Sequence, residues 1–424
     1  MAQLSDDCFA FSGPLMPLAD MEKLIAERVQ PVAETEVVSL NDVRGRVIAE
    51  NIASLLDLPP FDNSAVDGYA VRHRDLAATA ETKLKVTGRL TAGKSAPEPI
   101  SPGQAVRIFT GAPMPPGADT VFMQEDVQVE GDTVILPPGL KPGSNSRLTG
   151  EDVKKGAVVL PAGRRLATQD IALAAGIGLT RLKVRRRVRV ALFSTGDEIV
   201  EPGQPRPNAS TYDANRYLLS GMLERLGATV TDLGIIKDEP ASLVKAIGEA
   251  ARTNDLVLTS GGVSTGEADY VRDAVEKVGK LVFWRVAIKP GRPVAMGVIP
   301  GSSPGTSAAF MGLPGNPVAA FVTFARVARP LLLRLAGALP EPLIALPVRL
   351  SFAYKKKSGR REYVRVSLRR AADGTVEAVK HPQDGAGVIT SLTETDGLAE
   401  IAEEVATLEA GATVGFLSYA TLIG

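Results

Sequence analysis

Sulfur and imidazole ligands are scarce in this chain. Of its 424 residues, one is a cysteine, Cys8, and two are histidines, His73 and His381, which lie far apart in the sequence. A single cysteine excludes an intramolecular disulfide and a thiolate metal cluster. A His-rich zinc site is not expected either, so any bound metal should be held by carboxylates.

Long apolar runs and an excess of charge are also missing. No run approaches the roughly 20 apolar residues of a membrane-spanning helix. The N-terminus carries acidic residues rather than the basic start of a signal peptide. Lys and Arg together number 48, as do Asp and Glu, so no global field favours nucleic acid or an anionic membrane. We therefore expect a cytoplasmic protein that binds neither.

The chain is long and rich in turn residues. With 424 residues, 45% of them hydrophobic, it exceeds what one core supports, and its 41 glycines and 30 prolines favour many short β elements. Strands and helices alternate over residues 185–335, which predicts a mainly parallel sheet with helices on both faces. We expect an α/β multidomain protein. It combines this three-layer α/β/α unit with an elongated helical and β domain (1–57 with 149–184), a β-rich insert (58–148) and a C-terminal β-barrel-like domain (336–424).

A glycine-rich turn, residues 259–269, lies between an apolar strand and an amphipathic helix. Its adjacent glycines, Gly261 and Gly262, let backbone N–H groups approach an anion at the start of the helix. Taken alone, the segment is as readily a tight strand-to-helix turn with a polar cap. Two further strand ends, 194–198 (STGDE) and 314–317 (PGNP), carry similar chemistry. The residues of these turns that we expect to bind substrate are Ser260, Gly261, Gly262, Ser264, Pro314, Gly315 and Asn316.

Three carboxylates follow strands of the same predicted sheet: Glu198, Asp238 and Asp269. Because ligands bind outside the carboxyl ends of parallel strands, we expect these groups to converge on one edge. Hard oxygen ligands beside glycine turns suit a nucleotide or diphosphate with a divalent cation. The alternative is that the three carboxylates are helix caps that never meet.

Basic residues occur in three clusters. In residues 289–293 (KPGRP), Lys289 and Arg292 are positioned to clamp an oxyanion, although a solvated turn explains the segment equally well. Residues 355–361 are basic enough for anion binding but more typical of a charged hairpin rim. Residues 185–187 (RRR) are interpreted as an exposed entry to a strand, with a phosphate role as the minor alternative.

Five segments occur in a familiar order: 62–70 (DNSAVDGYA), 109–115 (FTGAPMP), 194–198 (STGDE), 260–264 (SGGVS) and 313–317 (LPGNP). With them the chain, from about residue 15 to its end, resembles the molybdopterin molybdotransferases, the MoeA family, which is related to the C-terminal part of gephyrin. The resemblance implies an elongated homodimer that inserts molybdate into adenylylated molybdopterin and releases AMP, with an active cleft shared between subunits.

The resemblance also implies roles for individual residues. Asp238 and Asp269 would hold Mg²⁺ against the diphosphate, Glu198 would orient the pterin or nucleotide, and several cations would neutralise molybdate. Partners would be the adenylyltransferase and the molybdoenzymes that accept the cofactor. The residues carried over by their position in the family's motifs are Asp67, Thr110, Asp152, Glu198, Asp238, Asp269, Arg285, Lys289 and Arg360.

The chain departs from the family pattern at Ala214 and Ala386, where serine is usual. The loss of the second hydroxyl removes an expected oxyanion contact, for which Thr390 and Ser391 are the alternative donors. Three other functions stay open at this point: adenylylation of molybdopterin, a paralogue specific for tungstate, and a non-catalytic cofactor carrier or scaffold. The loops around Asp67 and Thr110 argue against the first, and the intact acidic set argues against the last.

Overall fold

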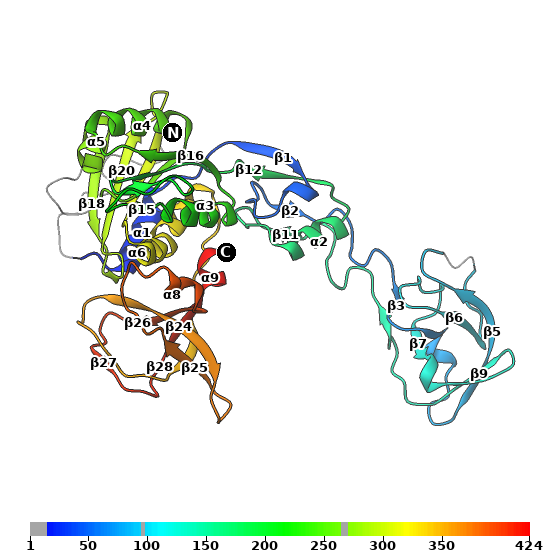
Figure 1. The fold of residues 1–424 in the computed structure, drawn as a ribbon. Coiled ribbons are helices and arrows are strands. Elements are labelled where there is room, and N and C mark those ends of the chain that lie inside the picture. Colours follow the sequence, from blue (N-terminus) through cyan, green and yellow to red (C-terminus); the bar gives the residue numbers. More distant parts are fainter. Residues whose placement is uncertain (1–14, 95–97, 264–269) are drawn as a thin grey trace.

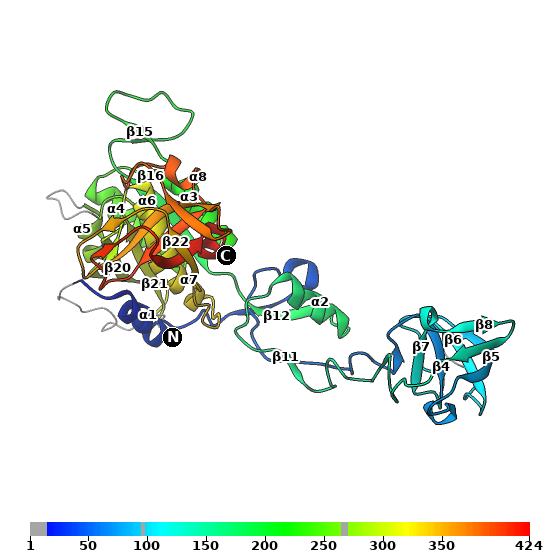
Figure 2. The same cartoon turned by 90° about the horizontal axis from the view of Figure 1, so that it is seen from below.

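The structure is a computed structural model that describes residues 15–94, 98–263 and 270–424. Figures 1 and 2 show an elongated molecule, in which an α/β unit lies beside a C-terminal β unit and a narrow arm leads to a separate β-rich unit. None of the helices in the described segments has the length and hydrophobicity that crossing a bilayer requires.

The α/β unit is built on a six-stranded sheet in the order β16-β13-β17-β21-β20-β18. Five strands run in the same direction, and β20, between β21 and the edge strand β18, runs antiparallel to both neighbours. The strands are β13 (Arg189–Thr195), β16 (Thr229–Ile236), β17 (Leu256–Ser260), β18 (Lys280–Arg285), β20 (Pro293–Pro300) and β21 (Ser307–Leu313). The sheet is therefore mainly parallel, as predicted.

Helices cover both faces of this sheet. Successive side chains of its strands point to opposite faces, and each face forms an apolar core with its helices. Val190 and Leu192 of β13 pack in one core, and Ala191 and Phe193 in the other. The helices of the first face are α1 (Leu18–Arg28), α3 (Asn215–Arg225), α6 (Pro317–Thr323) and α7 (Arg329–Leu335), with the π-turn η4 (Phe324–Ala328) between the last two. Those of the second face are α4 (Pro240–Thr253) and α5 (Tyr270–Val278). The three-layer α/β/α architecture follows.

The arm is formed by chain segments that precede and follow the β-rich unit. Strand β1 (Thr35–Ser39) pairs with β12 (Arg181–Arg185), and β2 (Ile52–Ala53) pairs with β11 (Val158–Leu160). Val43 and Ile48 share one core with Leu160, Leu166 and Leu182. The arm also holds η1 (Leu40–Asp42) and α2 (Thr168–Gly176). The predicted division of the chain into four domains stays a prediction. Helix α1 was assigned to the elongated domain by that division, but it packs in the core of the α/β unit.

The β-rich unit contains one six-stranded sheet in the order β7-β4-β6-β5-β9-β8. Two short strands, β3 (Asn63–Ser64) and β10 (Ser146–Arg147), pair where the chain enters and leaves it. The sheet strands are β4 (Gly68–Val71), β5 (Thr82–Leu90), β6 (Gln104–Ile108), β7 (Thr120–Met123), β8 (Gln128–Glu130) and β9 (Thr133–Leu136), with the 3-10 turns η2 (His73–Asp75) and η3 (Gln124–Asp126). Strands β4 and β7 were not predicted.

The C-terminal unit is a closed five-stranded barrel, because β24 pairs with both β25 and β26 and so joins the ends of the sheet. Its strands are β22 (Leu346–Leu350), β24 (Arg361–Arg370), β25 (Val376–Lys380), β26 (Gly397–Ile401) and β28 (Thr413–Ser418). The hairpin β23 (Tyr354–Lys355) with β27 (Thr407–Leu408) and helices α8 (Thr390–Thr393) and α9 (Tyr419–Ile423) complete it. The structure thus confirms the predicted fold class.

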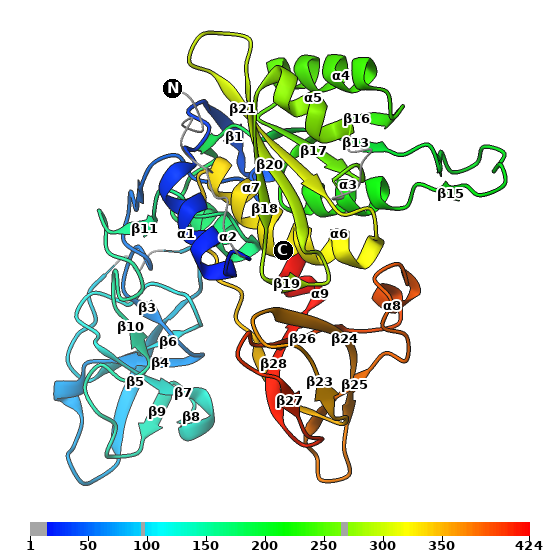
Figure 3. The same ribbon diagram turned by 90° about the vertical axis from the view of Figure 1, so that its left-hand side faces the viewer.

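Two short elements join or extend these units. Strand β19 (Ile288–Lys289), from the connection between β18 and β20 of the α/β sheet, pairs in parallel with β24 of the barrel. Strands β14 (Ile199–Val200) and β15 (Thr211–Tyr212) pair at the base of a long loop that projects from the α/β unit (Figure 3).

Candidate functional site

An acidic group lies where strands β13 and β16 end. The Thr195 hydroxyl, at the end of β13, donates a hydrogen bond to Asp238 Oδ1 at 3.3 Å. Burial raises the pKa of Asp238, and the negative charges of Asp197 and Glu198 raise it further, while the Thr195 hydrogen bond opposes them. Glu198 and Asp238 therefore lie close enough to interact, as predicted from the strand ends. Asp269 lies outside the described residues.

Asp197 is a third member of this group, although the sequence interpretation had not selected it. Within the described part of the chain, none of Asp197, Glu198 and Asp238 forms an ion pair with a Lys or Arg. Gly196 permits the tight turn that begins directly after β13: its φ is +143°, and a Cβ there would lie 2.6 Å from Glu198 Oε2. The sequence feature that could have identified Asp197 is its position between Gly196 and Glu198, which makes two adjacent carboxylates after a glycine.

The two glycines after β17 adopt left-handed conformations, with φ of +93° at Gly261 and +65° at Gly262. The N–H of Gly261 donates to the carbonyl of Leu313 at 3.0 Å. This N–H is therefore not free to bind an anion, contrary to the expectation for this turn. A Cβ on Gly261 would lie 2.6 Å from the carbonyl oxygen of Thr195, so the turn packs directly against the end of β13. Ser264 lies outside the described residues.

Asn215, the first residue of α3, fastens the turns that follow β17 and β21. Its Nδ2 donates to Ser260 Oγ at 2.8 Å and to the Gly315 carbonyl at 2.7 Å. Ser260 Oγ in turn lies 3.2 Å from the Pro314 carbonyl, and Asn316 is the N-cap residue of α6. The Oδ1 of Asn215 is buried without a hydrogen-bond partner among the described residues. The sequence interpretation missed this residue, whose neighbour Ala214 is exposed on the same cleft.

These strand ends border a cleft of about 510 Å³, which we call the acidic cleft. Its predicted members are Glu198, Ser260, Gly261, Gly315 and Asn316. The remaining residues that line it include Ser194, Thr195, Tyr212, Asp213, Asn215 and Gly387, the last from the barrel. One edge of the α/β sheet therefore provides most of its wall.

A second cavity, of about 590 Å³, lies between the α/β unit and the barrel, and we call it the cationic hollow. The pairing of β19 with β24 forms it by placing Lys289 opposite Glu362. Pro314 and Asn316 also line it, so Asn316 borders both cavities. Its charged lining residues are Lys289, Lys355, Arg365, Lys380, Glu362 and Asp384.

Glu362 lies at the centre of the charges in the cationic hollow, with a side chain that is 2% exposed. Its Oε2 accepts hydrogen bonds from Lys289 Nζ at 3.1 Å and from the Tyr354 hydroxyl at 2.9 Å. Its Oε1 has no hydrogen-bond partner among the described residues, and Arg360 Nη2 lies 3.6 Å away. Burial raises the pKa of Tyr354, and the bond to Glu362 adds to this. Two predicted cations, Lys289 and Arg360, thus converge on a carboxylate that sequence reasoning missed.

Arg365 is a second residue that sequence reasoning missed. It is buried, and it donates to Ser391 Oγ at 3.1 Å and to the carbonyls of Gln383 and Gly385 at 3.0 and 3.2 Å. Burial lowers the pKa of its guanidinium group, and nearby Asp384 opposes this effect. Ser391 is held by Arg365 and by the Val388 carbonyl and is fully buried, so it does not replace the hydroxyl missing at Ala386, which lines the hollow.

Arg285 and Arg292 lie apart from this arrangement. Both side chains are exposed, and neither lines the cationic hollow. The expected clamp of Lys289 and Arg292 is not formed within the chain, because the turn holds Arg292 by its carbonyl, which accepts from Val286 N, and leaves its side chain outside.

The remaining predicted residues lie in the arm and the β-rich unit. Asp67 Oδ1 accepts hydrogen bonds from the N–H and hydroxyl of Thr110 at 2.8 and 2.7 Å, and these bonds lower the pKa of Asp67. Asp152 is exposed and is tied by its N–H to the Leu58 carbonyl. Figures 1 and 2 place the β-rich unit far from the α/β unit. One chain therefore does not bring Asp67 and Thr110 to the acidic cleft.

No group of three or more His, Cys, Asp or Glu side chains in the described segments is arranged to hold a metal ion by itself. Glu198 lines the acidic cleft, and Asp197 and Asp238 lie near Glu198 without lining it. The site as a whole consists of an acidic and a cationic cavity that adjoin at Asn316.

Comparison with known families identifies all three parts of the chain. A model of the MoeA N-terminal region (domain I and II) matches residues 16–178. A probable molybdopterin binding domain matches residues 191–334, and the MoeA C-terminal region (domain IV) matches residues 347–419.

Individual relatives are similar over nearly their whole length. A molybdopterin molybdenumtransferase from Haemophilus influenzae is 38% identical, with 97% of this chain and 100% of the relative covered. Molybdopterin molybdenumtransferase 2 from Mycobacterium tuberculosis is 34% identical, with 92% and 96% covered. The crystal structure of a molybdopterin biosynthesis MoeA protein from Pyrococcus horikoshii OT3 has a TM-score of 0.76 at 29% identity and covers 96% of this chain and 100% of that one. On this similarity, and with both cavities built from the matched regions, the chain belongs to the MoeA family of molybdopterin molybdenumtransferases.

Proposed function

We propose that this protein inserts molybdate into adenylylated molybdopterin and releases AMP, which completes the molybdenum cofactor in the cytoplasm. The observation that carries the proposal is that an acidic and a cationic cavity meet at Asn316. The reaction joins a nucleotide-linked pterin to a tetrahedral dianion, so it needs adjacent sites of opposite character. The names of the relatives point to the same reaction class.

The acidic cleft suits the diphosphate together with Mg²⁺. Asp197, Glu198 and Asp238 carry negative charge that no Lys or Arg of the described residues pairs with, and burial opposes the ionised form of Asp238. Mg²⁺ is usually held by one or two carboxylates plus phosphate oxygens and water, so an open set of carboxylates fits it. Asp238, with Asp269 from the adjoining segment, would hold the ion, which when bound offsets charge on the diphosphate as its P–O bond breaks.

The residues around the acidic cleft orient the substrate. Thr195 fixes one oxygen of Asp238, and Asn215 holds the turns at Ser260 and Gly315 in place. Glu198 is exposed on the cleft, where its carboxylate is available to the pterin or the ribose. Positioning of this kind contributes to phosphoryl chemistry mainly by holding the reacting groups in line.

The cationic hollow suits molybdate. Lys380 is paired with Asp384 at 2.6 Å, and Glu362 offsets one further charge. The cations left over, from Lys289, Lys355, Arg365 and nearby Arg360, exceed what Glu362 neutralises. A tetrahedral dianion needs several converging cations and donors, which this wall supplies. Arg285 and Arg292 would contribute only if another subunit or a rearrangement brought substrate to them.

The homodimer is part of the proposal. Asp67, Thr110 and Asp152 lie in the arm and the β-rich unit, away from the acidic cleft of the same chain (Figure 1). A partner subunit that places its β-rich unit over the cleft would bring these residues to the substrate. Sedimentation of the purified protein tests this, since a monomer that retains full activity would exclude a shared site.

The activity is tested by mixing purified protein with adenylylated molybdopterin, Mg²⁺ and molybdate. AMP release that requires both Mg²⁺ and molybdate, with cofactor able to activate an apo-molybdoenzyme, supports the proposal. The absence of AMP release under these conditions would exclude it. Replacing molybdate by tungstate in the same assay determines which oxyanion the hollow prefers.

A further inference from the structure

A third cluster of charges lies at the junction of the arm and the α/β unit, away from both cavities of the proposed reaction. It borders a groove of about 470 Å³, which we call the arginine groove. The groove is lined by Glu34, Thr35, Glu36, Arg46, Arg186, Arg187, Arg189 and Thr229. These residues come from β1 and the residue before it, from the segment after η1, from the connection between β12 and β13, and from the starts of β13 and β16.

Two of the four arginines have carboxylate partners. Arg186 forms a bidentate pair with Asp255, at 2.9 and 3.0 Å, and also pairs with Glu34. Arg46, which is 6% exposed, pairs with Glu36 and donates to the Arg185 carbonyl. Four guanidinium groups thus face three carboxylates, those of Glu34, Glu36 and Asp255.

Arg187 and Arg189 have no ion pair with a carboxylate of any described residue. Arg187 is half-buried, and its side chain donates one hydrogen bond, to the Gly227 carbonyl at 3.0 Å, out of five N–H donors available. Burial lowers the pKa of Arg187, and the neighbouring charge of Arg46 lowers it further, whereas Glu36 opposes both. A cation desolvated beside another cation is stabilised by an added anion.

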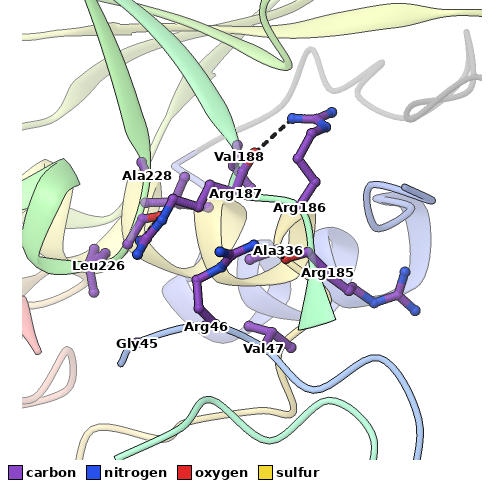
Figure 4. Close-up of a pocket in the computed structure, with 12 residues that line it drawn as sticks. Gly45, Arg46, Val47, Arg185, Arg186, Arg187, Val188, Leu226, Ala228 and Ala336 are labelled. Atoms are coloured by element: carbon purple, nitrogen blue, oxygen red, sulfur yellow. Dashed lines mark hydrogen bonds between the residues drawn. The ribbon is translucent and has the colours of Figure 1, made fainter. Parts of the chain in front are cut away.

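Figure 4 shows how the side chains lie around a small cavity that shares Arg46, Arg186 and Arg187 with the groove. The side chains of Arg46 and Arg187 lie near each other, whereas those of Arg185 and Arg186 point elsewhere. This cavity measures about 20 Å³, which is room for a single water molecule. A ligand would therefore occupy the open groove rather than the cavity.

We propose that the arginine groove binds the phosphate group of inorganic phosphate or of a small phosphomonoester. Arg187 and Arg189, which have no ion pair among the described residues, would bind the phosphate, and the hydroxyls of Thr35 and Thr229 would be further donors. Guanidinium groups match phosphate geometry through paired N–H bonds, which favours phosphate over a spherical anion. The groove volume admits a phosphate with a small organic group attached.

The location gives such binding a structural effect. Arg46 and Thr35 belong to the arm, whereas Arg187 and Arg189 lead into the α/β sheet. A phosphate bound to both sides would bridge the two chain connections between the arm and the α/β unit. We expect it to raise the thermal stability of the full chain, because it binds only where both parts are folded together.

The test measures binding of inorganic phosphate to the full-length protein by calorimetry, at an ionic strength held constant with chloride. The variants are Arg187→Gln and Arg189→Gln, and the matched control is Arg181→Gln, an exposed arginine of the same arm that does not line the groove. We expect saturable binding by the wild type and the control, weakened about tenfold or more in Arg187→Gln, since hydrogen bonds to charged groups carry that much affinity.

The outcome is decisive even if Arg187→Gln does not fold, because Arg189 is exposed and its replacement leaves the packing intact. Weakened binding in Arg189→Gln supports the proposal, whereas wild-type affinity in both folded variants overturns it. The absence of saturable phosphate binding by the wild type also overturns it. A second titration, with a nucleoside monophosphate, identifies the source of the phosphate group. If the nucleotide binds more tightly than inorganic phosphate and Arg189→Gln loses this binding, the ligand is a phosphomonoester. If the two bind equally, the ligand is free phosphate.

Discussion

The acidic cleft and the cationic hollow adjoin at Asn316 but are built in different ways. The acidic cleft is assembled from successive strand ends of one sheet; its lining residue Glu198 is exposed and has no ion pair among the described residues, whereas Asp213 is buried and paired with Arg216. The cationic hollow is assembled from two units, and its cations surround a buried carboxylate, Glu362. The comparison teaches that the first cavity needs a cation from outside, whereas the second carries its own counter-charge.

The largest effect is expected from removing the negative charge of Asp238, which lies near Glu198 of the acidic cleft. Asp238→Asn should lower the rate of AMP release by about 100-fold or more, because one charge-stabilising group is commonly responsible for that much of the rate. Binding of molybdate in the cationic hollow should stay within about twofold. The assay is Mg²⁺-dependent AMP release, with the exposed neighbour Glu239→Gln as the control. Equal rates for Asp238→Asn and the wild type would show that this carboxylate has no part in the reaction.

The converse change removes a cation from the hollow. Lys289→Met should raise the KM for molybdate by about 10- to 100-fold, since a charge-assisted hydrogen bond is lost. The affinity for AMP in the acidic cleft should not change. Arg292→Gln is the matched control, because Arg292 is exposed and does not line the hollow. A larger effect from Arg292→Gln than from Lys289→Met would mean that the oxyanion binds elsewhere.

A smaller effect of opposite sign is expected at the internal counter-charge. Glu362→Gln removes a carboxylate that holds Lys289 and repels a dianion, while the amide can keep a hydrogen bond to Tyr354. Molybdate should therefore bind about three- to tenfold more tightly, as measured by calorimetry. Glu377→Gln, which changes a barrel ion pair away from the hollow, serves as the control. Weaker binding by Glu362→Gln would show instead that Glu362 matters chiefly for positioning Lys289.

The smallest effect concerns pH. Because burial and neighbouring carboxylates raise the pKa of Asp238, the folded protein holds this proton to higher pH than the unfolded chain does. The contribution of Asp238 to folding stability is therefore greatest at low pH and falls as pH rises from about 3.9, the ordinary value, through the raised value. Mg²⁺ favours the carboxylate, so its affinity should rise over the same window. Both dependences should disappear in Asp238→Asn when unfolding and Mg²⁺ binding are titrated.

The acidic cleft could be predicted from the sequence to a large extent. Glu198 and Asp238 meet because parallel strands place their carboxyl ends at one edge, which the alternation of strands and helices already implies. The sequence pattern could not show which backbone N–H groups are already hydrogen-bonded. The N–H of Gly261 donates to the Leu313 carbonyl and is therefore not open to an anion. Likewise, the antiparallel strand β20 follows β18 without an intervening helix, so the alternation of strands and helices did not indicate it.

The cationic hollow was less accessible because it depends on contacts between distant segments. Lys289 and Arg360 were selected by their charge, yet their shared partner Glu362 is set by the pairing of β19 with β24. Arg365 was missed because its importance lies in burial, which a basic residue in a strand does not reveal. Arg292 was selected by its charge and Arg285 by its position in a family motif, and both lie outside the hollow.

The two-residue strand β19 limits how this region of the chain can change. Its pairing with β24 fixes which side of the backbone Lys289 occupies, since successive side chains of a strand point in opposite directions. Insertion or deletion of one residue between β18 and β19 would turn Ile288 toward Glu362 and move the ammonium group to the far side. The length of this connection is therefore as constrained as the identity of its lysine.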